Sequence, residues 1–337
     1  MRIWRIFSTR RGKSIFWALM LFCVLAAAAL SLWTGSVALS PGQVLAVLTG
    51  RDASSTAARI IFYSRMPRTF AALLAGAALA VAGAVIQTVL HNPLASPGVI
   101  GVNSGAGFAV ALCCAAAPAA RQYTPFVALC GALTAVLLVT GLSWRTGASR
   151  ITVVLAGVAI SALFGAGIDA VVTLVPDALD GVADFRVGGF TGVTMAQLIP
   201  AGGLIFVSLG AVLSLARQMD ILGLGSDTAR SLGLSVGVVR FLLLFLAAVL
   251  AGAAVSFCGL MGFVGLIVPN TMRRLLGESS LSLTAASALG GAFFVTVCDV
   301  LARILFAPFE LPVGIILAFA GAPFFLWLLL WQKGVRA

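Results

Sequence analysis

Long runs of apolar residues, separated by short polar breaks, make up most of the chain. A run of about 20 apolar residues is long enough to cross the ~30 Å hydrocarbon layer of a membrane as an α-helix. Continuous runs of this kind favour helices over the alternating pattern of a membrane β-barrel. The pattern predicts ten transmembrane helices, at 14–33, 67–90, 98–118, 124–142, 152–174, 195–216, 237–257, 260–275, 281–304 and 312–331. The predicted fold class is an all-α polytopic membrane protein, with one domain over residues 1–337.

Two of the predicted helices carry patterns of their own. Ala72, Gly76, Ala80 and Ala84 recur every four residues and form one small-residue face, where another helix can approach closely. The segment 259–269, GLMGFVGLIVP, is rich in glycine and ends in proline. It predicts a short or broken helix, which is tolerated at membrane depth only where protein surrounds it.

Composition excludes an ordinary soluble domain. Hydrophobic residues make up 61% of the chain and charged residues 9%, against about 25% charged residues in soluble domains. The net charge of +11 arises from basic residues that lie mainly beside the predicted helix ends. Orientation in a membrane explains this placement better than nucleic-acid binding does. Most of the basic residues fall on the side of the two termini, which predicts cytoplasmic termini and a cytoplasmic N-terminal segment at 1–13.

Candidate chemistry is sparse. His91, the single histidine, opens the polar break HNPLASPGVIGVNSGAG at 91–107, and no Cys, Asp or Glu stands at metal-ligand spacing from it. One histidine at a membrane boundary supports no Ser/His/Asp catalytic set. The six cysteines lie in apolar runs, where they are expected to be buried. The chain is therefore predicted to be neither an enzyme nor the holder of a metal or cofactor.

Two prolines shape the break, and two acids interrupt the apolar runs. Pro93 predicts the end of the preceding helix at Asn92, and Pro97 is placed in the first turn of the next helix. Asp299 lies four residues before Arg303, so a helix would pair them on one face. Asp169 has no such neighbour and is a candidate to line a polar pathway.

Four stretches resemble the FecCD-type permeases, the membrane subunits of ABC importers for iron-siderophores, haem and cobalamin. They occur in the order of the family, from about residue 60 to the end. One departure is Asn270, where the family usually has histidine, and the loop before ITVVLAGV also differs in length. The stretches are RMPRTFAALLAGAALAVAGAVIQTVLHNPLASPGVIGVNSGAG (65–107), DTARSLGL (227–234), GLMGFVGLIVPNTMRRLLG (259–277) and CDVLARILFAPFELPVGIILAFAGAPFFLWLL (298–329).

The resemblance implies a type II ABC importer permease architecture in the bacterial inner membrane. Two permeases, identical or different, would form a pore at their shared interface. Two ATP-binding subunits would bind ATP and Mg²⁺ on the cytoplasmic side, so that ATPase activity resides in a partner chain. An extracytoplasmic solute-binding protein would deliver the cargo.

The resemblance also implies roles for individual residues. By similarity to the cobalamin permease of the family, Asn92 and Leu94 match positions that close the pore toward the cytoplasm; a tight structural turn without gating is the alternative. The cytoplasmic coupling segment, 217–236, would contact the ATPase. Its expected contact residues are Asp227, Ala229, Arg230, Leu232 and Gly233.

Three arginines are expected on the outer side. Arg65, Arg68 and Arg303 match family positions that meet acidic residues of the binding protein, and the planar fork of arginine pairs carboxylates well. The alternative is an interfacial arginine with no partner.

The expected cargo is a preformed metal chelate, because one histidine and no clustered thiolates leave no evident site for a bare metal ion. A ferric siderophore is the first choice, with haem and cobalamin as alternatives. The main rival of another class is an ion-coupled secondary transporter, which Asp169 and the Gly/Pro break would suit. A non-transporting scaffold would not need the coupling segment.

Overall fold

The computed structural model describes residues 10–35, 37, 39–50, 55–145, 150–307 and 309–334, so residues 1–9 of the predicted N-terminal segment lie outside the described residues. Within these ranges the chain is helical and contains no strand. The long helices are α1 (Arg10–Trp33), α4 (Met66–Leu90), α5 (Val102–Ala116), α6 (Thr124–Arg145), α7 (Arg150–Leu174), α9 (Met195–Ser214), α12 (Val236–Cys258), α13 (Val264–Leu276), α14 (Ser280–Ile304) and α15 (Val313–Gly334). The short ones are α2 (Pro41–Leu48), α3 (Thr56–Ile60), η2 (Ile61–Arg65), η3 (Pro97–Ile100), η4 (Pro118–Tyr123), η5 (Pro176–Ala178), α8 (Leu179–Val187), α10 (Ala216–Gly223) and α11 (Ser226–Ser231).

Each of the ten predicted spans overlaps one long helix. In the described part of the chain, seven helices are long and apolar enough to cross a membrane, as parts of α1, α3–α4, α6, α7, α9, α12 and α14. The apolar segments Val102–Ala116 and Val313–Leu328 are shorter, and α13 has 13 residues. The chain is thus a multi-pass helical protein, while the count of ten crossings stays a prediction.

One predicted boundary needs correction. The third helix was expected from residue 98, with Pro97 in its first turn; Pro97 instead opens the 3₁₀ turn η3, and α5 begins only at Val102. Gly101 separates them because its φ of +84° lies outside the helical region. The predicted break near 259–269 is confirmed, since α12 ends at Cys258 and α13 begins at Val264. However, α13 continues through Pro269 to Leu276.

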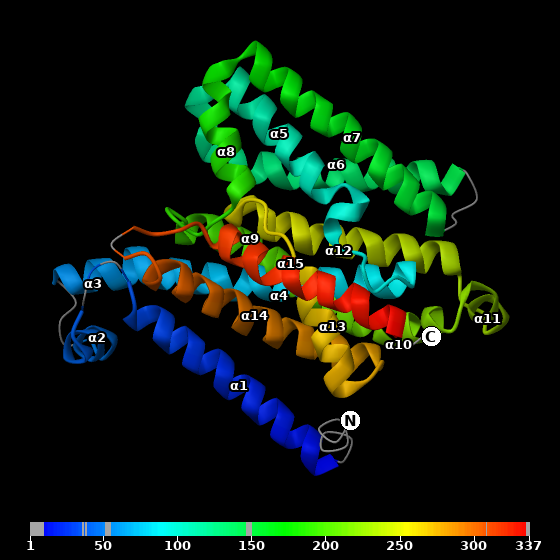
Figure 1. The fold of residues 1–337 in the computed structure, drawn as a ribbon, viewed down its shortest axis with the longest axis horizontal. Coiled ribbons are helices and arrows are strands. Elements are labelled where there is room, and N and C mark those ends of the chain that lie inside the picture. Colours follow the sequence, from blue (N-terminus) through cyan, green and yellow to red (C-terminus); the bar gives the residue numbers. More distant parts are fainter. Residues whose placement is uncertain are drawn as a thin grey trace.

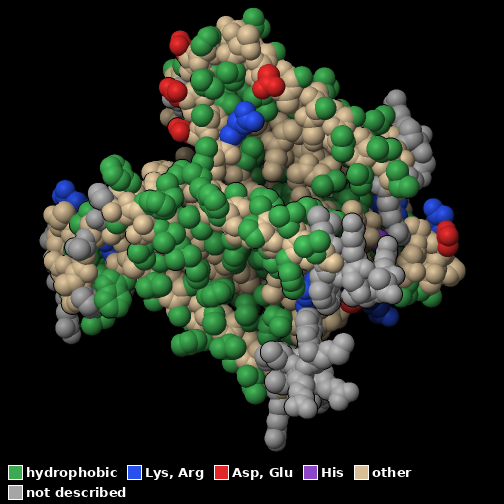
Figure 2. Space-filling model, viewed as in Figure 1, with side chains coloured by type: hydrophobic (Ala, Val, Ile, Leu, Met, Phe, Trp, Pro, Cys, Tyr) green, Lys and Arg blue, Asp and Glu red, His purple; other side chains and the backbone are tan. Residues whose placement is uncertain are grey.

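The helices form a layered bundle (Figure 1). Helices α5, α6, α7 and α8 make the upper layer of the view, and α4, α9, α12, α13, α14 and α15 the middle, with α1 along the lower side. The α10–α11 segment lies at one end of the bundle, together with the start of α1 and the end of α15; α2 and α3 lie at the other end. Hydrophobic side chains cover the middle of the face shown in Figure 2, and charged side chains gather toward its edges. This distribution suits a protein that crosses a membrane along the long axis of its helices.

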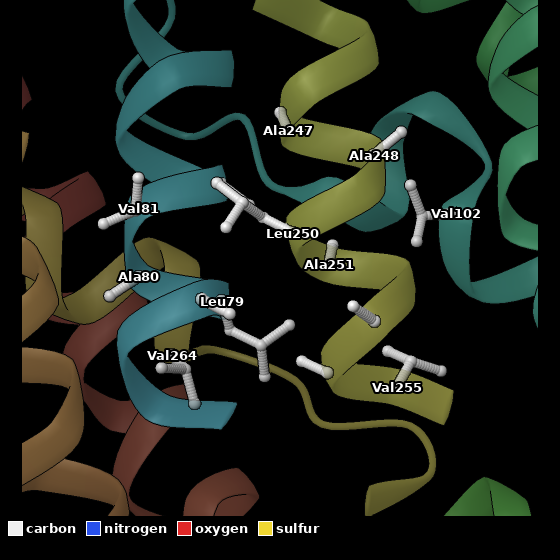
Figure 3. Packing of buried hydrophobic residues seen from close by; sticks show 14 of the residues in the cluster. Leu79, Ala80, Val81, Val102, Ala247, Ala248, Leu250, Ala251, Val255 and Val264 are labelled. Atoms are coloured by element: carbon white, nitrogen blue, oxygen red, sulfur yellow. The ribbon is translucent and has the colours of Figure 1, made fainter. Parts of the chain in front are cut away.

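Helix α4 runs through the centre of the core and is buried along most of its length. Figure 3 shows Leu79 of α4 and Leu250 of α12 pointing into the space between the two helices, whereas Val81 lies on the side of α4 away from α12. Small residues allow these close approaches.

The closest contacts of α4 use glycine. A Cβ on Gly76 would lie 2.1 Å from the carbonyl oxygen of Gly291 in α14, and a Cβ on Gly83 would lie 2.0 Å from that of Gly265 in α13. Because Gly76 belongs to the predicted small-residue face, the close helix approach expected there is confirmed. Only a residue without a Cβ fits at these points.

We expect Gly83→Ala to lower the melting temperature, because the added methyl must push α13 away from α4. Overpacking a tight core costs about 1–3 kcal/mol, which exceeds the roughly 1 kcal/mol that alanine gains over glycine in a helix. The matched control is Gly210→Ala in α9, where no neighbouring atom lies within 4 Å. Thermal unfolding in detergent measures both variants. Equal stability of the two would contradict the packing described here.

Candidate functional site

The turn at residues 91–95 ends α4 with a backbone motif that usually requires glycine. The N–H of His91 donates to Thr88 O at 3.3 Å, and the N–H of Asn92 donates to Gln87 O at 3.1 Å. These two hydrogen bonds form the helix-ending motif in which the residue after the helix is left-handed, and His91 has φ 51° and ψ 38°. A residue with a Cβ pays roughly 1–2 kcal/mol for this conformation.

The two expected gate residues lie in this 91–95 turn. The Oδ1 of Asn92 accepts the N–H of Leu94 at 2.9 Å, which closes a local side-chain turn of the kind asparagine favours. Asn92 is exposed, and Leu94 is half-buried. The structure therefore brings both residues together in one ordered turn.

Helix α13 holds the end of α4 through Gln87. Pro269 has no N–H to donate to the carbonyl of Gly265, four residues earlier. The Nε2 of Gln87 donates to that carbonyl instead, at 3.0 Å, and its Oε1 accepts from Nη1 of Arg273 at 3.0 Å. The buried amide of Gln87 thus supplies the hydrogen bond that the Gly265 carbonyl lacks because of Pro269, and it joins α4 to α13.

Asn270 joins α13 to the 91–95 turn. Its Nδ2 donates to Pro93 O at 2.8 Å and to Leu266 O at 2.8 Å. Asn270 is the position at which this chain departs from the histidine usual in the resembling family. Its amide fixes the turn against α13.

The expected coupling segment, residues 217–236, consists mainly of α10 and α11. Ala229 is buried, whereas Asp227 and Arg230 are exposed and pair at 3.5 Å. An exposed pair of this kind contributes little to stability. Leu232 is 59% exposed, and Gly233 turns the chain with a φ of +83°. Of the expected contact residues, Ala229 thus faces the core and the others face outward.

A cleft of about 600 Å³ separates α10 from the end of α4 and from the start of α14. His91, Asn92, Asp220, Arg273 and Glu278 are among its lining residues. It therefore places the 91–95 turn and the coupling segment on facing walls of one space.

A buried ion-pair network occupies the opposite end of the bundle. Asp299 is fully buried and lies 2.9 Å from Nη2 of Arg68 and 2.9 Å from Nη2 of Arg303. The second acid on Arg68 is Glu310. The pairing of Asp299 with Arg303 predicted from their spacing is confirmed. The contact with Arg68, 231 positions away in sequence, was not predicted.

The arginines of this network also hold the end of α1. Arg303 donates to Ser31 O at 3.0 Å and to Thr34 O at 2.8 Å. Arg65 donates to the carbonyls of Leu32, Trp33 and Val37. Cations at a helix C-terminus satisfy carbonyls that lack partners within the helix.

This burial bears on the expected docking role. Arg65, Arg68 and Arg303 are only 4%, 9% and 3% exposed, so their guanidinium groups face acids and carbonyls of their own chain. The expectation that they project toward an outside partner does not describe this conformation. Docking itself stays a prediction.

Asp169 lies on an exposed position of α7. It lines a cleft of about 410 Å³ together with Thr173 of the same helix and Arg186 of α8. The sequence named Asp169 as a pathway candidate, and the structure gives it an open face beside a basic residue. In the described part of the chain, no group of three or more His, Cys, Asp or Glu side chains is placed to hold a metal ion.

The model of the FecCD transport family matches residues 21–331 of the chain. The chain belongs to the FecCD transport family. Among curated FecCD relatives, the achromobactin transport system permease protein CbrC of Dickeya dadantii is 38% identical over 320 residues, which cover 94% of this chain and 91% of the relative. The hemin transport system permease protein HmuU of Yersinia pestis is 38% identical over 281 residues, which cover 81% and 84% of the two chains.

A solved structure described as an inward-facing conformation of a metal-chelate type ABC transporter has the same fold. The TM-score is 0.83 at 27% identity, with 93% of this chain and 97% of the other covered. The FecCD fold thus extends over nearly the whole chain.

Two residues of the site escaped prediction. Gln87 and Asn270 act through carbonyls far away in sequence, which no local pattern reveals. A signal for Gln87 did exist: a proline inside a helix leaves one carbonyl without an N–H, and Gln87 is one of the few polar residues of α4.

Proposed function

We propose that the chain is the membrane-spanning permease subunit of an ABC importer, which carries a metal chelate inward while a separate subunit hydrolyses ATP. The observation that carries this proposal is the α10–α11 segment, which stands at one end of a FecCD fold and exposes Leu232 and the Asp227–Arg230 pair. An exposed apolar side chain rimmed by charges is a suitable contact for a soluble partner.

The proposed assembly has a second permease subunit, identical or different, two ATP-binding subunits that hold ATP and Mg²⁺, and an extracytoplasmic solute-binding protein. It lies in the bacterial inner membrane, with ten crossings and both termini in the cytoplasm. Only 17% of the residues in the most apolar stretch of helix α7 are buried within the chain. This exposure supports a pathway beside α7, lined by Asp169, at the contact between two permeases.

We place the binding-protein contact at the end of the bundle that holds Arg65, Arg68 and Arg303. Their bonds fix α1, α4 and α14 relative to one another. In this proposal they shape the docking surface from within.

A ferric siderophore is the proposed cargo, and haem is the alternative. Relatives named for achromobactin and for hemin are equally similar in identity. The deciding experiment titrates the cognate binding protein with a ferric siderophore, haem and cobalamin. Retention of the siderophore, followed by its ATP-dependent uptake through the reconstituted permease, supports the proposal. If the binding protein retains only haem or only cobalamin, the proposed siderophore cargo is wrong and the retained ligand replaces it.

We expect Asn92→Ala/Leu94→Ala to raise leakage of chelate through the assembled transporter without ATP. Alanine removes the side-chain bond that closes the 91–95 turn and the apolar bulk of Leu94. Efflux from preloaded proteoliposomes measures the leak. The control is Gly98→Ala, because a Cβ there meets ordinary contact distances of 3.6 Å or more. If the double variant leaks no more than the wild type, the turn has a structural role only and does not close the pore.

A further inference from the structure

His91 links the 91–95 turn to the coupling segment. Its Nε2 lies 3.1 Å from the carbonyl oxygen of Gly223, 132 positions away. Gly223 is the last residue of α10, and carbonyls in the last turn of a helix have no N–H partner within it. The ring therefore donates to a carbonyl that is available at the end of α10.

The backbone at His91 adopts a conformation that carries a cost for any residue with a Cβ. Its left-handed conformation would suit glycine better. Histidine at this point keeps a strained backbone and gains a side chain that reaches another element. Strain of this kind concentrates where the surrounding structure uses it.

Two further polar contacts of the coupling segment lead to other helices. The Oδ1 of Asp220 accepts the N–H of Ser280 at the start of α14, at 2.8 Å. The Nη2 of Arg240 in α12 donates to Oγ of Ser226 at the start of α11, at 3.2 Å. These two contacts attach the segment to the helix bundle, whereas the His91 contact attaches it to the 91–95 turn.

The contact lies beside the cleft of about 600 Å³. His91 and Gly223 both line it, so the two segments meet at the edge of a space that packed side chains do not fill. On the far side of the turn, Asn270 holds Pro93 at 2.8 Å. A displacement of α10 would thus pull on the first residue of a turn whose middle residue is bonded to α13.

We propose that His91 is a positioning residue that transmits movement of the α10–α11 segment to the 91–95 turn. The inference rests on the proposed function, because it requires an ATPase to move the segment. His91 contacts neither cargo nor nucleotide in this scheme. It acts through the turn that carries Asn92 and Leu94.

The test compares His91→Gly with His91→Gln in the transporter assembled with its ATPase subunits. Glycine suits the positive φ but removes the bond, whereas glutamine keeps an N–H donor at a similar reach. We expect His91→Gly to melt no lower than the wild type and to hydrolyse ATP normally. Its uptake of chelate per ATP hydrolysed should fall by about fivefold, the effect of one hydrogen bond. Glutamine should restore most of the uptake.

Three results separate the possible failures. If His91→Gly imports as much chelate per ATP as the wild type, the link is wrong. If it melts lower and glutamine restores neither stability nor uptake, His91 is merely a structural cap, which also overturns the inference. If the wild type itself shows no ATP-dependent uptake, the proposed function fails first, and the inference falls with it.

Discussion

Replacing Asp299 by asparagine should cost about 3–5 kcal/mol, the usual effect of removing one partner from a buried ion pair. Asp299 is fully buried and forms ion pairs with both Arg68 and Arg303. Asparagine has nearly the same shape, so the loss reports charge rather than volume. The melting temperature in detergent and the yield of folded protein should both drop.

The control for this variant is Asp177→Asn, which changes an exposed acid. It should leave the melting temperature unchanged, because exposed charges contribute little. Adding Arg303→Gln to Asp299→Asn should recover part of the loss, since one unpaired buried cation is removed. Wild-type stability of Asp299→Asn alone would show that the network does not hold α1, α4 and α14 together.

Replacing Leu232 by glutamate should weaken binding of the ATPase subunits by about 30-fold or more. Leu232 is the exposed apolar residue among the expected contacts, at 59% exposure. Charge at the centre of an interface removes a buried anchor, which costs about 2 kcal/mol or more, or about 30-fold in Kd. Co-purification of the tagged permease with its ATPase, followed by titration, measures the loss.

The matched control is Leu305→Glu, because Leu305 is equally exposed, at 58%, and follows the far end of α14. This variant should bind the ATPase subunits as the wild type does. If Leu232→Glu also binds them normally, the α10–α11 segment is not the coupling contact.

The helices were predictable because membrane length and apolar composition act locally. Each predicted span overlaps a long helix. The glycine-rich segment GLMGFVGLIVP correctly predicted the interruption between α12 and α13. The start of α5 was misplaced because a proline can open a 3₁₀ turn as well as an α-helix, and the left-handed Gly101 decides between them.

The polar contacts were much less predictable because their partners are distant in sequence. Arg68 meets Glu310, 242 positions away, and Gln87 meets Gly265, 178 positions away. Local spacing revealed the pair of Asp299 with Arg303, since four residues make one helical turn. Local spacing could not reveal that the same carboxylate also binds Arg68. Nor could it reveal that the side chains of Arg65, Arg68 and Arg303 are buried.

The positions of the expected gate and coupling residues followed from resemblance, whereas the contact between their two segments required the structure. No pattern in the sequence joins His91 to Gly223. The contact exists because α10 folds back toward the end of α4, and such a fold is fixed by tertiary packing of Met219 and Leu222, both fully buried.

The most direct test of the account is uptake of a doubly labelled ferric siderophore, with one label on iron and one on the chelator. The permease is reconstituted with its ATPase subunits and binding protein, and vesicles receive either ATP or an ion gradient. The account predicts that both labels enter together, in the ratio of the intact chelate, and only with ATP. Entry driven by the gradient without the ATPase, or entry of iron without its chelator, would contradict it.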